Sequence, residues 1–194
     1  MVRTVETFRR CKEEVMAKIR NKMIALAGML ALAVSTAIAA PGASSQYESL
    51  VEKQVYKKIV SIPRYNVFDH LAFKVEGNTV TLLGQVVRPT TRKEAERRVA
   101  KIEGIDRVIN KIEVLPISAF DDSIRIRTYR AVFRAGSLYR YAQGVNPSIR
   151  IVVKHGHVTL EGFVASKSDR NLAYIAASQV PGVFSVTNNL RVER

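Results

Sequence analysis

One stretch of the sequence, Val75 to Val114, is repeated 78 residues later as Val153 to Val192, and the two copies align without a gap. Twelve positions are identical at this spacing, and both copies contain the motif Val-Thr-Leu-x-Gly-x-Val, at 80–86 and at 158–164. Because the spacing is constant, strands and helices must keep the same order and length in both copies. The chain is therefore predicted to be a tandem of one small module.

The two modules are expected at residues 47–115 and 123–194, joined by a linker at 116–122. Domains of this size have small cores, so a deep catalytic pocket is not expected in either module. The composition, with 47% hydrophobic and 25% charged residues, is that of a folded protein. Only the net charge of +14 is unusual.

The N-terminal segment has the layout of a secretory signal peptide. Arg20 and Lys22 precede an uncharged run, residues 23–40, which contains a small-residue triplet ending at Ala39. This pattern favours cleavage after Ala39, so residues 1–39 are predicted to be removed. The charged segment ahead of the run is long, and Met16 would make a more ordinary start.

An uncleaved membrane anchor is the alternative for this segment, because the uncharged run is only just long enough to cross a bilayer. Residues 1–39 hold seven basic and three acidic residues, so the remainder carries a net charge of +10. The only cysteine, Cys11, precedes the run and cannot act as the lipid acceptor of a lipoprotein. The mature chain is expected in the periplasm, without disulfides and held together by packing alone.

The first module follows a polar spacer at residues 40–46. Val51, Val55, Ile59 and Ile62 recur at spacings of three and four until Pro63, which predicts a helix. Gly77-Asn78 predicts a hairpin between two strands, and the spacing of Thr91 and Glu94 predicts a capping box for a second helix that ends at Gly104. The expected elements are a helix at 49–61, strands at 71–76 and 79–87, a second helix and a strand at 107–115.

The second module repeats this order. Ser168 or Asp169 is expected to cap its second helix, and Gly182 is expected to end it. Gly136, Gly144 and Pro147 mark a longer loop between the first helix and the first strand. The expected elements are a helix at 123–135, strands at 148–154 and 157–165, a helix at 169–179 and a strand at 184–192.

The predicted fold class is α+β, with two tandem αββαβ modules. In each module the second helix is a crossover that makes the second and third strands parallel. Both helices therefore cover one face of a three-stranded mixed sheet. The other face is open, and the sister module or a partner is expected to pack against it.

The paired Val-Thr-Leu-x-Gly-x-Val strands, each followed by a helix, a glycine and a Val-x-Asn-x-(Ile/Leu)-x-Val strand, resemble two BON domains. This family is named after bacterial osmotically inducible and nodulation proteins, and the arrangement is similar to that of osmotically inducible periplasmic proteins. The resemblance implies a non-enzymatic envelope protein that binds phospholipid surfaces and helps to maintain membrane integrity under stress. It carries over no catalytic residues and implies no cofactor.

The residues that match between the copies have structural interpretations. Gly84 and Gly162 lie inside strands, where a glycine allows a bulge or the close approach of a helix. Gly104 and Gly182 are expected in left-handed turns after helices. Asn110 and Asn188 are expected to form local hydrogen bonds at strand edges rather than to bind a ligand.

The clearest functional signal is the first helix of the second module, where arginines alternate with aromatic residues. Guanidinium groups pair with phosphate, and aromatic rings suit the boundary between headgroups and acyl chains, so this pattern predicts contact with an anionic phospholipid surface. A solvated face whose arginines pair with Asp121, Asp122 or the sister module is an equal alternative. The candidate lipid-binding residues are Arg127, Arg130, Arg134, Tyr129, Phe133, Tyr139, Arg140 and Tyr141.

Other constellations have weaker functional support. His155 and His157 flank a turn, but a structural zinc site needs four ligands, so no metal site is predicted. The basic strip of the first module, Arg92 to Lys101, contains enough glutamates to be a solvated, ion-paired helix. Export excludes nucleic acid as a partner, whereas envelope proteins are a second class of partner. The runner-up function is a protein-binding adaptor or chaperone-like module, and a hydrolase would require a cleft that the residues do not indicate.

Overall fold

The computed structural model describes residues 41–144 and 146–193, and the side chains from Tyr47 onward. These residues belong to one compact unit, Ala40–Arg194. The predictions of a signal peptide, of a membrane anchor and of a later start concern residues outside the described ranges. Within those ranges, no helix combines the length and the apolar composition needed to cross a membrane.

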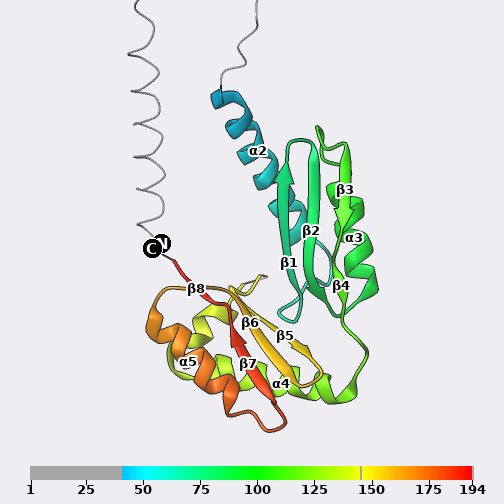
Figure 1. Ribbon diagram of the computed structural model, residues 1–194. Helices are drawn as coiled ribbons and strands as arrows, with labels where there is room; N and C mark the ends of the chain where they lie inside the picture. The colour runs from blue at the N-terminus through cyan, green and yellow to red at the C-terminus, as the bar shows by residue number, and fades with distance from the viewer. Residues whose placement is uncertain (1–40, 145, 194) are drawn as a thin grey trace, which may run out of the picture. The chain divides into compact units, whose positions relative to one another are not determined.

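The two modules have the same order of elements, which confirms the α+β class and the tandem arrangement (Figure 1). The first module comprises α2 (Pro41–Val60), β1 (His70–Glu76), β2 (Thr79–Val86), α3 (Pro89–Val99), β3 (Arg107–Asn110) and β4 (Glu113–Val114). The second comprises α4 (Ala119–Arg134), the 3-10 helix η1 (Gly136–Ala142), β5 (Ile149–Lys154), β6 (His157–Val164), α5 (Lys167–Ser178), β7 (Ser185–Asn188) and β8 (Arg191–Val192).

Each sheet is mixed, as predicted. β1 and β2 are antiparallel, whereas β3 and β4 both run parallel to β2, and β5 to β8 repeat this pairing around β6. The pairing of Leu82 with Asn110 and of Gln85 with Glu113 keeps one register, so β3 and β4 are two parts of a single interrupted strand. The strands predicted at 107–115 and at 184–192 therefore exist, but each is broken in the middle.

Asn110 and Asn188 lie at these breaks. The Asn110 side chain accepts a hydrogen bond from the Ile112 amide at 3.1 Å and donates to the Arg92 carbonyl at 3.3 Å. Asn188 makes the same pair of bonds, with the Leu190 amide and the Arg170 carbonyl. Each asparagine thus replaces a missing ladder bond and ties the strand to the preceding helix.

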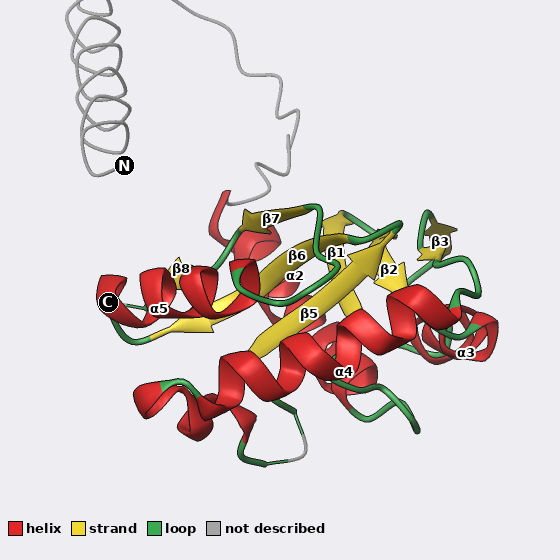
Figure 2. Ribbon diagram, turned by 90° about the horizontal axis from the view of Figure 1, so that it is seen from below, coloured by secondary structure: helices red, strands yellow, loops and turns green. Residues whose placement is uncertain are grey.

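Two helices cover one face of each sheet (Figure 2). In the first module, the apolar spacing of α2 places Val51, Val55 and Ile59 in a core with Ala95 and Val99 of α3. Alternate residues of β2 complete that core. In the second module, α4 and α5 cover β5 and β6 in the same way. This alternation leaves the opposite face of each sheet outside the module's own core.

Both first helices begin earlier than predicted. α2 starts at Pro41, so the stretch interpreted as a polar spacer is helical; proline suits the first turn, and extending a packed helix adds a hydrogen bond per residue. α4 starts at Ala119 because the Ser118 side chain accepts from the Asp121 amide at 3.1 Å. This cap shortens the linker predicted at 116–122.

The predicted caps of the second helices were wrong. α3 begins at Pro89 without a side-chain cap, and Thr91 is buried inside the helix. α5 begins at Lys167 because Ser166, not Ser168 or Asp169, accepts from the Asp169 amide at 3.0 Å. In α3 a proline at the first helical position starts the helix, and in α5 an earlier serine provides the cap. The capping residues predicted from spacing are therefore not used.

The sister modules contact one another, as predicted from the open faces of their sheets. The Ile151 amide donates to the Val67 carbonyl at 2.8 Å, and the Val67 side chain belongs to the core of the second module. Lys154 pairs with Glu113 at 2.6 Å, so part of the open face of each sheet is covered by the other module.

Candidate functional site

Three arginines form a row on the exposed side of α4, which we call the arginine row: Arg127, Arg130 and Arg134. Their spacings of three and four place them on one side of the helix. Within the described residues, none of the three forms an ion pair. Arg127 instead donates to the Ser123 hydroxyl at 3.0 Å. The row is therefore an exposed positive surface.

The carboxylates expected to neutralise these arginines are engaged elsewhere. Asp121 is buried and accepts the amides of His155 and Gly156 at 2.9 and 2.8 Å, which fixes the β5–β6 turn. Asp122 forms its ion pair with Arg125, whose side chain is buried. The alternative in which Asp121 or Asp122 pairs with the arginine row does not occur in this structure.

A shallow groove of about 440 Å³ lies between α4 and the C-terminal end of α5. Arg127 and Arg130 line it together with mostly small or apolar side chains. The remaining lining residues are Ala131, Ala135, Ala176, Gln179, Val180 and Pro181. The groove therefore combines positive charge with an apolar surface.

Tyr129 and Phe133 of α4 turn away from the arginine row. Phe133 is only 6% exposed and lies in the core of the second module. Tyr129 packs against Phe133, with ring centroids 4.8 Å apart, and against Phe68 of the first module at 6.2 Å. The predicted lipid contact of Phe133 is corrected by its burial, and Tyr129 lies at the contact between the modules.

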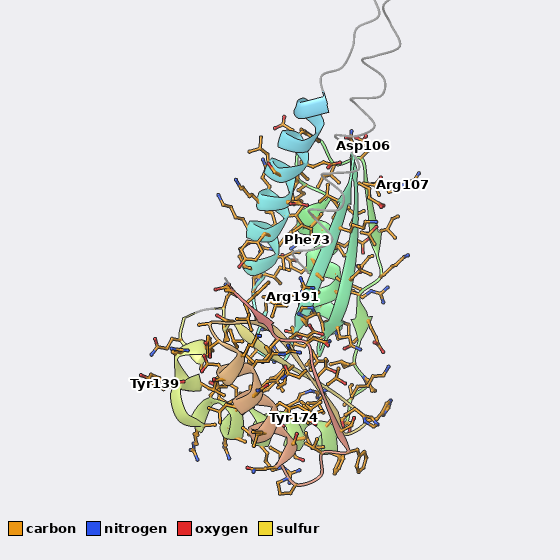
Figure 3. All side chains as sticks on the ribbon, turned by 60° about the vertical axis from the view of Figure 1, so that its left-hand side comes forward. Phe73, Asp106, Arg107, Tyr139, Tyr174 and Arg191 are labelled. Atoms are coloured by element: carbon orange, nitrogen blue, oxygen red, sulfur yellow. The ribbon has the colours of Figure 1, made fainter. Side chains whose placement is uncertain are left out.

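The three candidate lipid-binding residues on η1 differ in their surroundings. Tyr139 is 60% exposed and lies at the periphery of the molecule (Figure 3). Arg140 pairs with Asp169 at 2.6 Å, and the buried Tyr141 hydroxyl donates to the same carboxylate at 2.9 Å. These two residues therefore hold the N-terminal turn of α5; burial of Tyr141 removes it from the surface, whereas the lipid contact of the exposed Arg140 stays a prediction.

Asp169 collects several hydrogen bonds at this position. The Ser166 hydroxyl donates to it at 2.7 Å, and the Ser137 hydroxyl at 3.0 Å. The hydrogen bond from Ser166, followed by those from Tyr141 and Ser137, lowers the pKa of Asp169 below its ordinary value. The carboxylate thus stays charged at the helix N-terminus, where the helix dipole favours a negative charge.

Sequence reasoning missed two exposed aromatic residues at one end of the second module, which we call the aromatic tip: Phe120 and Phe184. They are 47% and 70% exposed, respectively. The rings of Phe120 and Phe184 lie 6.1 Å apart. The signal that could have found Phe120 is its position seven residues before Arg127, which places both on the same side of α4.

The aromatic tip is continuous with the arginine row. A Cβ atom added to Gly182 would lie 3.4 Å from the Phe120 ring and 3.5 Å from the Arg127 guanidinium. Both side chains therefore pack over the same turn between α5 and β7. The groove, the arginine row and the aromatic tip together form one surface on the helical side of the second module.

The glycines of the strand motif lie where only glycine fits. Gly84 and Gly162 have φ angles of +114° and +116°. A Cβ at Gly84 would overlap the His70 carbonyl oxygen, and one at Gly162 would overlap the Ser148 carbonyl oxygen. The close approach is that of the neighbouring strand rather than of a helix. Gly104 and Gly182 have φ angles of +86° and +88°, but the helices end before them, with their C-caps at Ala100 and Gln179.

Potential metal ligands do not cluster in the described part of the chain. It holds no cluster of three or more histidine, cysteine or acidic residues that could bind a metal ion. His157 shares a hydrogen bond of 2.7 Å with the exposed Ser185 hydroxyl. On α3, Arg97 and Arg98 both pair with Glu94 at 2.5 Å, which confirms the prediction of an ion-paired, solvated helix.

Comparisons with known proteins identify the module. The family model "BON domain" matches residues 51–116 and 140–194. BON domains are known from phospholipid-binding and osmotic-stress proteins and are generally non-enzymatic. No curated protein sequence matches the chain.

Two similar solved structures are of CdsD, a structural protein of the type III secretion system of Chlamydia trachomatis. The first is 8% identical, covers 74% of this chain and 92% of its own, and has a TM-score of 0.30. The second, a C-terminal domain, is 10% identical, covers 73% of this chain and 96% of its own, and has a TM-score of 0.26. Similarity at this level supports no conclusion about function.

Proposed function

Because the chain belongs to the BON domain family, we propose that it is an exported, non-enzymatic protein that associates with anionic phospholipid surfaces and supports envelope integrity under stress. In this proposal residues 1–39 direct export to the periplasm, and the second module provides the membrane contact. Envelope proteins are a further class of partner.

The observation that carries the proposal is the arginine row, none of whose members forms an ion pair with a described residue. An anionic surface attracts each nearby basic side chain by about 1 kcal/mol, so three arginines supply about 3 kcal/mol. Guanidinium groups also pair with phosphate through two parallel hydrogen bonds. The exposed Tyr139 and the apolar groove beside Arg130 suit the layer between headgroups and acyl chains.

The test is co-sedimentation of residues 40–194 with liposomes that contain or lack phosphatidylglycerol, at low and high salt. Wild-type protein is expected to bind only the anionic vesicles and to lose binding as salt increases. Reversing the arginine row, with Arg127→Glu, Arg130→Glu and Arg134→Glu, is expected to abolish binding while the circular dichroism spectrum is unchanged.

The matched control places the same charge change on the first helix of the first module. Lys53→Glu, Lys57→Glu and Lys58→Glu alter net charge equally, and all three lysines are exposed on α2. This variant is expected to keep most of its binding. Equal loss in both triple variants would show that only net charge matters and would refute the assignment to α4.

A protein-binding adaptor is the second candidate, and the open face of the first sheet favours it. Leu83 and Ile109 are 39% and 38% exposed on that face. In this case the double substitution Leu83→Ser and Ile109→Ser would abolish binding to the partner protein, whereas reversal of the arginine row would not. Failure of the wild-type protein to bind any vesicle would move the assignment to this candidate.

A further inference from the structure

The aromatic tip is held in place although its side chains face solvent. The Phe184 amide donates to the Gly156 carbonyl at 2.9 Å, and the Phe184 ring lies against Gly156, where a Cβ would be 2.6 Å from the ring. His157 contacts the same ring edge-on, with centroids 5.9 Å apart. Contacts with Gly156 and His157 therefore hold Phe184 in place, while 70% of the residue remains exposed.

The internal repeat shows that this turn does not need an exposed phenylalanine. At the spacing of 78 residues, Phe184 and Gly156 correspond to Asp106 and Asn78. In the first module, the Asp106 amide also donates to the Asn78 carbonyl at 2.9 Å, and the Asn78 side chain donates to the Asp106 carboxylate at 2.9 Å. Asp106 lies near the end of the first module that carries this turn (Figure 3). The same backbone hydrogen bond thus accompanies a polar pair in one module and an exposed aromatic residue in the other.

We propose that the aromatic tip inserts into the interfacial layer of an anionic bilayer, while the arginine row binds the phosphates beside it. This inference deepens the proposed function and rests on it. The bilayer is the occupant that the surface fits, because Phe120 and Arg127 lie on one side of α4 and over one turn. An apolar end continuous with unneutralised positive charge matches a surface in which phosphates border acyl chains.

Insertion can be measured directly because the chain contains no tryptophan. Phe184→Trp places a single fluorophore on the aromatic tip. With phosphatidylglycerol vesicles, its emission is expected to shift to shorter wavelength and to be quenched by lipids brominated on the acyl chain. Tyr174→Trp is the matched control, since Tyr174 is 44% exposed on α5 of the same module (Figure 3) and does not line the groove. Its emission is expected to change little.

Two results separate this inference from the proposed function. If the Phe184→Trp protein sediments with anionic vesicles but its emission is neither shifted nor quenched, the tip does not insert, and the proposed function still stands. If the wild-type protein fails to bind anionic vesicles, the proposed function fails and the inference fails with it. Equal quenching of both tryptophans would also overturn the inference, because the tip would then not be the inserted part.

A second variant tests the contribution of insertion to affinity. Phe184→Asp gives the second module the residue that the first module carries at this turn, so the fold is expected to persist. Partial burial of one phenylalanine corresponds to about tenfold in vesicle affinity, and the added charge opposes binding further. Phe184→Leu is expected to restore most of the affinity. Unchanged affinity of Phe184→Asp at low salt would contradict insertion.

Discussion

Replacing Gly84 with alanine tests whether the strand glycine of the repeated motif is a structural residue. Its φ of +114° costs an L residue about 1–3 kcal/mol in backbone strain. The new Cβ would also lie under 3.0 Å from the His70 carbonyl oxygen, so β1 and β2 must separate locally. Overpacking of this kind costs about 1–3 kcal/mol more. Together these effects predict a loss of about 2–6 kcal/mol, against about 5–15 kcal/mol for a whole domain.

The assay is urea unfolding followed by circular dichroism, with Gly77→Ala as the matched control. Gly77 also has a positive φ, +56°, but no atom lies within 4 Å of its added Cβ. The expected decrease in the free energy of unfolding is therefore only about 1–2 kcal/mol. Gly162→Ala should behave like Gly84→Ala, since its Cβ would overlap the Ser148 carbonyl. If Gly84→Ala costs no more than Gly77→Ala, or leaves stability intact while abolishing lipid binding, the structural interpretation is refuted.

Two further predictions concern ionisable groups. Asp169→Ala is expected to destabilise the protein by about 2–4 kcal/mol in chemical denaturation, because the buried Tyr141 hydroxyl and Arg140 lose their shared acceptor; wild-type stability in this variant would contradict the role given to Asp169. Burial lowers the pKa of His70 despite the Glu161 carboxylate 4.0 Å away, with Arg150 and Arg191 adding to the decrease. The unfolded chain therefore binds the proton more readily, so the free energy of unfolding should fall as pH decreases below about 6.5, and His70→Gln should flatten this dependence between pH 7 and pH 5. An identical pH profile in His70→Gln would exclude His70 as its source.

The fold could be predicted from the sequence because both copies of the repeat must form the same elements in the same order. Apolar spacing in α2 and alternation in β2 each identify a buried side, and the fixed spacing of the copies excludes alternatives that suit only one of them. Helix starts were less predictable, since several residues compete to cap one helix. Thr91 has the spacing of a capping residue, but Pro89 starts the helix two residues earlier. Which residue starts the helix depends on tertiary packing, and a local sequence pattern carries no information about that packing.

The candidate site was predicted only in part, because some of its features depend on one helix alone and others depend on tertiary packing. The arginine row follows from helical spacing, which depends only on α4 itself. The partners of its aromatic residues depend on what packs against α4, and the core and Phe68 take up Phe133 and Tyr129. The aromatic tip joins Phe120 to Phe184, which are distant in sequence and meet only because α5 ends beside the start of α4. No local pattern connects them.

The repeat also separates what the fold requires from what distinguishes the modules. The positions identical in both copies include the strand glycines and the asparagines at the strand breaks, whose structural roles are the same in each sheet. The differences are concentrated on the surface. In the first module Glu94 neutralises two arginines of α3, and Asp106 completes a polar turn. Among the described residues, no carboxylate forms an ion pair with the arginine row of the second module, and Phe184 takes the place of the aspartate. Because the Asp106 amide and the Phe184 amide make the same backbone hydrogen bond, an exposed phenylalanine at this turn is not a requirement of the fold.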